Sequence, residues 1–236
     1  MDGRVNVTLA VMVIIFTLIS FVVGLTVIGE VMSFAYNNQG AYVSLYAGSG
    51  YYVTILIISF INMIFQFIVL KEWMDVLNRN ILNTQSMIST IRTEDLSVKS
   101  EIEAASLELK NAMIKGWPFW GYMISYILGI LFIFEMGIAM FFEILAFVFL
   151  LIYLYHIFST SSSIYKTKSR LYSYLRNMKG LPNVQDMLQI TQRNIFLVVV
   201  FTIITAGIYW LYLIVKLSME INEYVKNDEI TRTKLT

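Results

Sequence analysis

The chain has 236 residues, of which 58% are apolar and 14% charged, whereas a soluble domain has about half apolar and roughly a quarter charged. The net charge of +1 argues against nucleic-acid binding, and the lack of cysteine excludes disulfides, thiolate nucleophiles and cysteine-based metal sites. The apolar residues form uncharged blocks of about 20, enough helix to cross roughly 30 Å of hydrocarbon. The composition therefore predicts an all-α polytopic membrane protein.

The first apolar block, residues 5–28, follows Arg4. It is too long for the core of a signal peptide and no small-x-small cleavage site comes after it, so we expect an uncleaved first span. The next segment, 29–51, is rich in Tyr, Gly and Asn. Residues 38–40 could turn a small hairpin with 41–46 as one strand, or the whole segment could be an irregular loop.

The second block, 52–70, is expected to run straight into a helical arm over 71–116. Mostly apolar residues recur in this arm at spacings of three and four: Trp73, Leu77, Ile81, Thr84, Ile88 and Ile91, then Val98, Ile102, Ala105, Leu109 and Ala112. This period predicts two helices joined by a tight turn and packed through one apolar seam.

Two further spans are predicted at 117–134 and 137–157. A stripe formed by Ile164, Leu171, Leu175 and Met178 predicts that the helix continues beyond 157 into a second arm, 158–193. Gly180 and Pro182 should end that helix, because glycine suits the position just past a helix end and proline cannot continue it. A short helix over 184–192 should then lead to a fifth block, 195–215.

The 17 Lys and Arg residues orient this arrangement of five transmembrane helices. Twelve lie in the two arms, while 29–51 and 135–136 contain none, so we expect a multi-pass cell-membrane protein with cytoplasmic arms and a cytoplasmic N-terminus. A single crossing by 195–215, which has the right length for it, would place the four basic residues after it outside. A return at Thr205-Ala206-Gly207 would keep all 17 inside. The length favours the single crossing.

Small residues share faces on two spans: Gly121, Ser125 and Gly129 on the third, and Ser20 with Gly24 on the first. Such faces let helix backbones approach closely inside a bilayer. Gly207 fits a close helix contact or a local kink. Packing within one chain is the simpler interpretation, and a seam between copies of the chain is the alternative.

Amide and carboxyl side chains lie inside predicted spans. Asn62 and Gln66 share one face of the second span, with Ser59, and Glu143 lies near the outer end of the fourth. An intramembrane acid marks a functional site by default, so Glu143 could meet Asn62 or Gln66 in a polar path or cation site. Glu143 could instead lie at the outer interface while the amides bond to neighbouring helices.

No sequence pattern of an enzyme is present: there is no phosphate-binding glycine loop, no His-Glu-x-x-His and no Gly-x-Ser-x-Gly. The sole histidine, His156, lies among tyrosines at the inner end of the fourth span and fits an interfacial residue. A lone histidine cannot form a metal site. We therefore expect no catalytic residues, no cofactor and no metal.

The stretch Thr205-x-Gly207-Ile208-Tyr209-Trp210, followed by Lys216 and Glu220-Ile221-Asn222, resembles a motif of small prokaryotic, including archaeal, multi-span membrane proteins of unknown function. The resemblance covers about 204–222. It implies a membrane-helix fold and no activity.

Three segments organise the chain: the first span with its loop, 1–51; a span pair with a helical-hairpin arm, 52–136; and a second span pair with a basic arm and tail, 137–236. The favoured function is a non-catalytic membrane scaffold or assembly component that contacts the lipid bilayer and binds copies of itself or other membrane subunits, without nucleic acid. The alternative is a channel or transporter component built around Asn62, Gln66 and Glu143.

Overall fold

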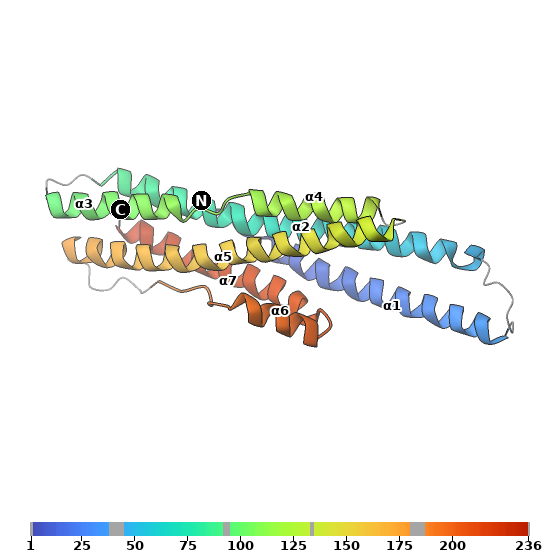
Figure 1. Ribbon diagram of the computed structural model, residues 1–236. Coiled ribbons are helices and arrows are strands. Elements are labelled where there is room, and N and C mark those ends of the chain that lie inside the picture. The colour runs from blue at the N-terminus through green and yellow to red at the C-terminus, as the bar shows by residue number, and fades with distance from the viewer. Residues whose placement is uncertain (1, 38–44, 92–94, 133–134, 180–186, 236) are drawn as a thin grey trace. The chain divides into compact units, whose positions relative to one another are not determined.

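The computed structural model describes residues 2–37, 45–91, 95–132, 135–179 and 187–235. Within these ranges the chain forms seven α-helices (Figure 1): α1 (Val7–Asn37), α2 (Leu45–Ser89), α3 (Leu96–Asn111), α4 (Trp117–Leu131), α5 (Met136–Lys179), α6 (Ile195–Ile204) and α7 (Ile208–Leu235). The chain divides into two compact units: Asn6–Val69, and Met1–Val5 together with Leu70–Thr236. The predicted all-α class is confirmed.

Three helices are long and apolar enough to cross a membrane: α1 over Val7–Thr26, α2 over Val53–Ser89 and α5 over Met136–Met178. Many of their large apolar side chains are exposed, including Phe21, Leu56 and Phe141. Outward-facing apolar side chains are what a helix needs to contact lipid tails, so the chain has the helices of a multi-pass membrane protein. The remaining apolar helices, α4 and α6, are shorter than 18 residues.

The unit Asn6–Val69 contains α1 and the first part of α2. The rings of Phe16 and Phe65 meet edge to face with centroids 5.3 Å apart. Asn62 Nδ2 donates a hydrogen bond of 2.9 Å to Thr17 Oγ1. Residues 38–44 lie outside the described part, as does most of the predicted hairpin, and α2 already begins at Leu45, so the predicted strand does not include 45–46.

The predicted first arm is present in the second unit. α2 continues without a break to Ser89, and α3 begins after Asp95, whose carboxylate accepts from the backbone N–H of Ser97 and Val98 as an N-cap. Gln85 donates to the Ser106 carbonyl, tying the two helices together. The expected seam is buried on both helices, at Trp73, Leu77, Ile81, Thr84 and Ile88 and at Val98, Ala105 and Leu109.

The prediction that the fourth span continues outward as one helix is also confirmed. α5 has 44 residues, about 66 Å of helix. α4 packs along its first part, where Phe119 and Tyr153 bring their rings to 6.0 Å, and α3 packs along its second part (Figure 1). The helix predicted over 184–192 is wrong for residues 187–192, which are irregular. Within them, Thr191 donates its backbone N–H and its hydroxyl to the Glu220 carboxylate.

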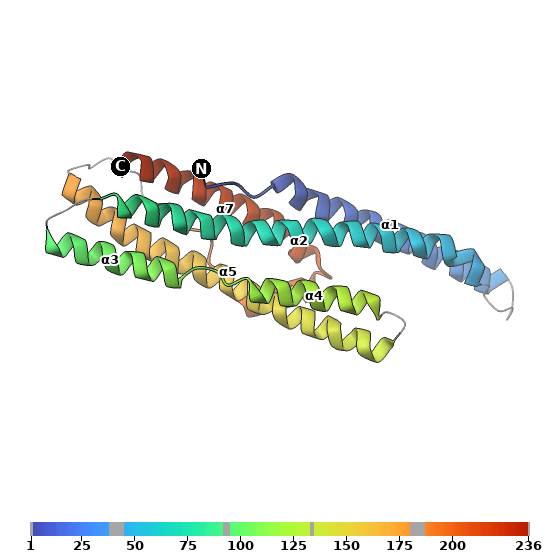
Figure 2. The same ribbon diagram turned by 90° about the horizontal axis from the view of Figure 1, so that it is seen from above.

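The single crossing favoured for 195–215 is wrong. α6 ends at Ile204, and the chain turns at Ala206 and Gly207, which have φ values of 48° and 91°. Arg193 and Glu220, 27 residues apart, nevertheless form an ion pair of 2.8 Å. An unbroken helix of that length would separate them by about 40 Å, so the chain reverses between them, as Figures 1 and 2 show.

The residues after Lys216, the predicted tail, are helical. They continue α7, which runs back alongside α5 to Leu235 (Figure 2). The helix buries a stripe at spacings of three and four, mostly apolar: Ile214, Leu217, Ile221, Tyr224, Asp228, Thr231 and Leu235. Burial of this stripe explains why the segment is helical despite its many charges.

Candidate functional site

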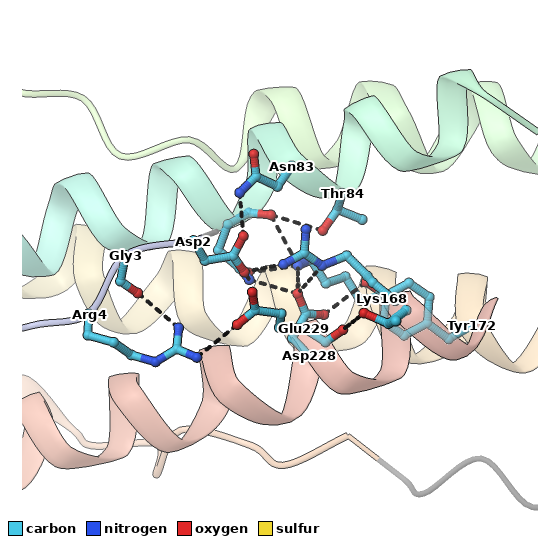
Figure 3. A network of polar contacts seen from close by, with 12 residues as sticks. Asp2, Gly3, Arg4, Asn83, Thr84, Lys168, Tyr172, Asp228 and Glu229 are labelled. Atoms are coloured by element: carbon cyan, nitrogen blue, oxygen red, sulfur yellow. Dashed lines mark hydrogen bonds and ion pairs between the residues drawn. The ribbon is translucent and has the colours of Figure 1, made fainter. Parts of the chain in front are cut away.

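A group of charged and polar side chains is buried where α2, α5 and α7 meet the N-terminal residues (Figure 3). We call it the charged cluster; its members are Asp2, Asn80, Asn83, Lys168, Tyr172, Asp228 and Arg232. Ionised groups are seldom fully buried, because removing them from water is costly unless they are paired and hydrogen-bonded. The cluster is therefore the most unusual chemical feature among the described residues.

Lys168 and Asp228 form the centre of the cluster, and both side chains are 0% exposed. Lys168 Nζ lies 2.9 Å from Asp228 Oδ2, 2.7 Å from Asn80 Oδ1 and 3.4 Å from the Asn80 carbonyl oxygen. Each of its three N–H donors thus has an acceptor. Asp228 in turn accepts from the Tyr172 hydroxyl at 2.8 Å and from Asn80 Nδ2 at 2.7 Å. The ring of Tyr224 lies 5.9 Å from Lys168 Nζ, within cation–π range.

Asp2 and Arg232 form a second, linked pair. Asp2 is almost completely buried and accepts hydrogen bonds from Arg232, Asn83 and Asn80, the last at 2.7 Å. Burial by itself would raise the pKa of Asp2, but these hydrogen bonds outweigh it and hold the pKa below its usual value. Burial by itself would lower the pKa of Arg232, but the neighbouring carboxylates of Asp228 and Asp2 outweigh it, so the pKa is raised above its usual value. Two carboxylates and two cations therefore balance inside the cluster.

The N-terminal residues are fastened to α7 beyond the cluster as well. Val5 donates its backbone N–H to Asn222 Oδ1 at 2.7 Å, and its carbonyl accepts from Asn222 Nδ2 at 2.8 Å. Arg4 pairs with Glu229 at 2.9 Å on the surface (Figure 3). The N-terminal segment is thereby held against α7 through the backbone N–H and carbonyl of Val5.

Regular helical spacing positions the cluster. α5 supplies Lys168 and Tyr172 four residues apart, and α7 supplies Asp228 and Arg232 four residues apart, so each pair shares one face of its helix. The sequence alone did not predict the cluster, because charged residues on a helix normally face solvent. The available signal was that Lys168 falls within the apolar stripe of its helix, beside Leu171 and Leu175.

The charges of the cluster are paired with one another. Each charge of the cluster has an opposite charge and further hydrogen bonds, and no three His, Asp or Glu side chains converge as metal ligands in the described ranges. What such a cluster can do is hold four segments that are distant in sequence in one geometry. Polar networks of this kind specify a unique packing when all their members are satisfied.

The predicted intramembrane polar residues fall in both units. Asn62 and Gln66 are half-buried in the unit Asn6–Val69, where Asn62 bonds to Thr17. Glu143 belongs to the other unit and is exposed on α5, with its Cγ 3.4 Å from the position that a Cβ on Gly129 would take. A polar site that unites Asn62, Gln66 and Glu143 stays a prediction.

The small-residue face of α4 is packed against α5. A Cβ on Gly121 would lie 2.7 Å from the Phe149 ring, and Ser125 and Gly129 are buried on the same face. This contact lies within one chain; a seam between copies stays a prediction. His156 contacts Trp117, with ring centroids 6.5 Å apart.

The predicted helix-packing residues Gly24 and Gly207 are less closely packed. A Cβ on Gly24 would meet no described atom within 4 Å, and the buried Ser20 hydroxyl has no hydrogen-bond partner among the described residues. The same open space surrounds Gly207, so its positive φ in the turn, rather than a close helix contact, is what calls for glycine.

No protein-family model, curated protein or solved structure matches the chain. The resemblance of the 204–222 motif to a membrane-protein family of unknown function therefore identifies no family. Structurally, the motif is the turn between α6 and α7 and the first half of α7, ending at the Arg193–Glu220 ion pair.

Proposed function

We propose that the protein is a non-catalytic membrane scaffold or assembly component, whose extramembrane helices present a rigid surface to copies of itself or to other membrane subunits. The observation that carries the proposal is the charged cluster. It satisfies its ionised groups internally and joins α2, α5, α7 and the N-terminal residues, so the arm is held in one shape without a ligand.

A scaffold also needs surface on which partners can pack. In the helical hairpin of α2 and α3, the α3 residues Leu107 and Leu96 have 60% and 80% of their surface exposed, beside charged residues of both signs. Arg170 of α5 binds Glu101 and Glu108 at 2.6 and 3.0 Å, which fixes part of this charged surface in place. A fixed surface avoids the entropy of ordering flexible side chains on association.

The proposed topology has the N-terminus, both arms and α7 on the cytoplasmic side. All 17 Lys and Arg residues belong to the unit formed by Met1–Val5 and Leu70–Thr236, and the reversal at Gly207 returns Lys216 to the same end as Arg193. Basic residues accumulate on the cytoplasmic side of membranes, which supports this orientation.

Cysteine accessibility tests the topology cleanly, because the chain has no cysteine of its own. Single cysteines at Lys226, exposed on α7, and at Met136, exposed at the start of α5, would be treated with a membrane-impermeant maleimide in intact cells and in inverted vesicles. We expect Met136→Cys to react from outside and Lys226→Cys from the cytoplasmic side only. Reaction of Lys226→Cys in intact cells would refute the topology.

Site-specific photocrosslinking tests the scaffold proposal. A benzophenone amino acid at Leu107 in native membranes should give discrete protein adducts, while the same group at the buried Leu109 should give none. Adduct formation should fall when Leu96 is changed to Lys. If Leu107 gives no protein adduct, and Glu143→Gln changes the flux of an ion or solute in reconstituted vesicles, the scaffold proposal is wrong and a channel or transporter component replaces it.

A further inference from the structure

Two hollows follow one another between α5 and the segment that contains α6. The first has a volume of about 250 Å³ and an almost wholly apolar lining, with Leu151 and Leu154 from α5 facing Val199 and Ile203 from α6. The second, of about 480 Å³, has polar side chains in its lining, including Ser159 and Ser162 from α5 and Gln192 and Asn194 before α6.

The two hollows share the same pair of walls. On α5, the apolar lining ends at Leu154 and the polar lining begins at Tyr155, on the next residue of the helix. On the other wall, the polar lining ends at Ile195 and the apolar lining begins at Val198, one turn further along α6. From Phe147 to Ser162 the α5 wall extends about 22 Å. The two hollows are therefore consecutive along the same two walls, and we refer to the pair as the groove, with an apolar end and a polar end.

The change from apolar to polar lining lies near the start of α6. α6 has 10 residues, about 15 Å of helix, which is half of a hydrocarbon core of roughly 30 Å. The polar end lies beside Asn194, the N-cap of α6, and beside Arg193, whose guanidinium binds Glu220. The apolar end lies along α6 toward the turn at Gly207. This division matches one leaflet, with its acyl chains at one end and its headgroups at the other.

We propose that the groove binds one glycerophospholipid, with an acyl chain along Leu151, Leu154, Val199 and Ile203 and the phosphate and glycerol at Ser159, Ser162 and Gln192. An apolar hollow in a bilayer is filled by hydrocarbon, because water there would lack hydrogen-bond partners. The hydroxyl and amide groups at the other end can donate to phosphate and ester oxygens. A single amphipathic molecule therefore satisfies both ends at once.

The charge at the polar end makes the proposal more specific. Arg193, the charged residue in the lining of the polar end, is paired with Glu220 through two hydrogen bonds of 2.8 and 2.9 Å, so the lining itself carries little free positive charge. Lys216, 3.8 Å from the same Glu220, lies outside this lining. Binding should therefore depend on the acyl chain and the phosphate more than on the net charge of the headgroup. We expect dioleoyl phosphatidylcholine and dioleoyl phosphatidylglycerol to bind within about threefold of each other, since Glu220 already pairs with Arg193 and the guanidinium is not free for an anionic headgroup.

Native mass spectrometry of the full chain tests the proposal. The detergent-purified protein would be incubated with each of these two lipids, and we expect one bound lipid per chain. Val199→Phe, which fills the apolar end, should lower the bound fraction at least fivefold, while Val200→Phe, one residue away and outside the lining, should not. Equal lipid retention by both variants, or a preference above tenfold for the anionic lipid, would overturn the proposal.

Fluorescence quenching of Trp210, which lines the apolar end, tests the same proposal in the wild-type protein and so does not depend on whether Val199→Phe folds. Lipid brominated on its acyl chain, added at one equivalent to the detergent-solubilised wild-type protein, should quench fluorescence, and Trp210→Phe should remove most of that quenching. If the quenching is unchanged in Trp210→Phe, the acyl chain is not in this groove and the proposal fails.

Discussion

The charged cluster should become destabilising when its central carboxylate loses its charge. Asp228→Asn keeps the size of the side chain and removes its charge. In the wild type, Asp228 accepts from Asn80 and Tyr172 and pairs with Lys168 and Arg232. In the variant, Lys168 stays buried without a carboxylate partner of its own, because Asp2, the other acid, is engaged by Arg232.

The expected cost follows from complete burial. Removing one partner of a buried ion pair leaves an uncompensated charge and typically costs about 3–5 kcal/mol. The unit that contains the cluster is in the size range in which 1 kcal/mol shifts Tm by about 2–4 °C. We therefore expect Asp228→Asn to lower Tm by roughly 6–20 °C.

Thermal unfolding of the full chain in detergent, followed by tryptophan fluorescence, measures this shift. Trp73 is a suitable reporter because its indole is fully buried and its Nε1–H donates to Ser218 of α7 at 2.8 Å. The indole should therefore become exposed to solvent when α7 separates. The control is Glu229→Gln. It breaks the pair with Arg4, in which both side chains are more than a third exposed, so it should cost at most about 1 kcal/mol.

A second variant separates charge from shape. Lys168→Met combined with Asp228→Leu replaces the central pair by apolar side chains and should recover much of the lost stability, because replacement of a whole buried pair is often neutral or stabilising. The electrostatic reasoning would be refuted if Asp228→Asn behaved like Glu229→Gln, or if the double variant were less stable than Asp228→Asn.

Three further outcomes are expected. Gly121→Leu should cost about 1–3 kcal/mol in thermal unfolding, because its Cβ would overlap the Phe149 ring, while Gly24→Leu should be nearly neutral; equal effects would contradict the packing. Gly207→Val should destabilise the turn by about 1–2 kcal/mol because of its φ of 91°, seen as faster proteolysis there; unchanged cleavage would count against it. Asp2 has a lowered pKa in the folded state, so the stability that its carboxylate contributes is present above its ordinary pKa of 3.8 and is lost as pH falls through the folded value. Asp2→Asn should therefore reduce the loss of stability at acid pH. An unchanged loss would show that the Asp2 carboxylate does not stabilise the fold.

The amino-acid sequence determined the elements whose signals are local. Uncharged blocks identified the apolar helices, and the spacing of three and four identified the arms. The continuation of α2 and α5 beyond their apolar parts followed from the same stripes, with Leu171 and Leu175 buried as expected. These features depend on residues within one or two turns of each other, so a single helix period is enough to find them.

Tertiary structure decided the course of residues 195–215 and the place of the charges. Length and hydropathy are the same for one 21-residue crossing and for two shorter helices around a turn; what distinguishes them is the ion pair of Arg193 with Glu220 and the positive φ of Gly207. Likewise, Lys168 and Asp228 look like solvated surface charges in sequence. They become a buried pair only because α5 and α7 lie side by side, and pairing between helices 60 residues apart leaves no periodic signal in the chain.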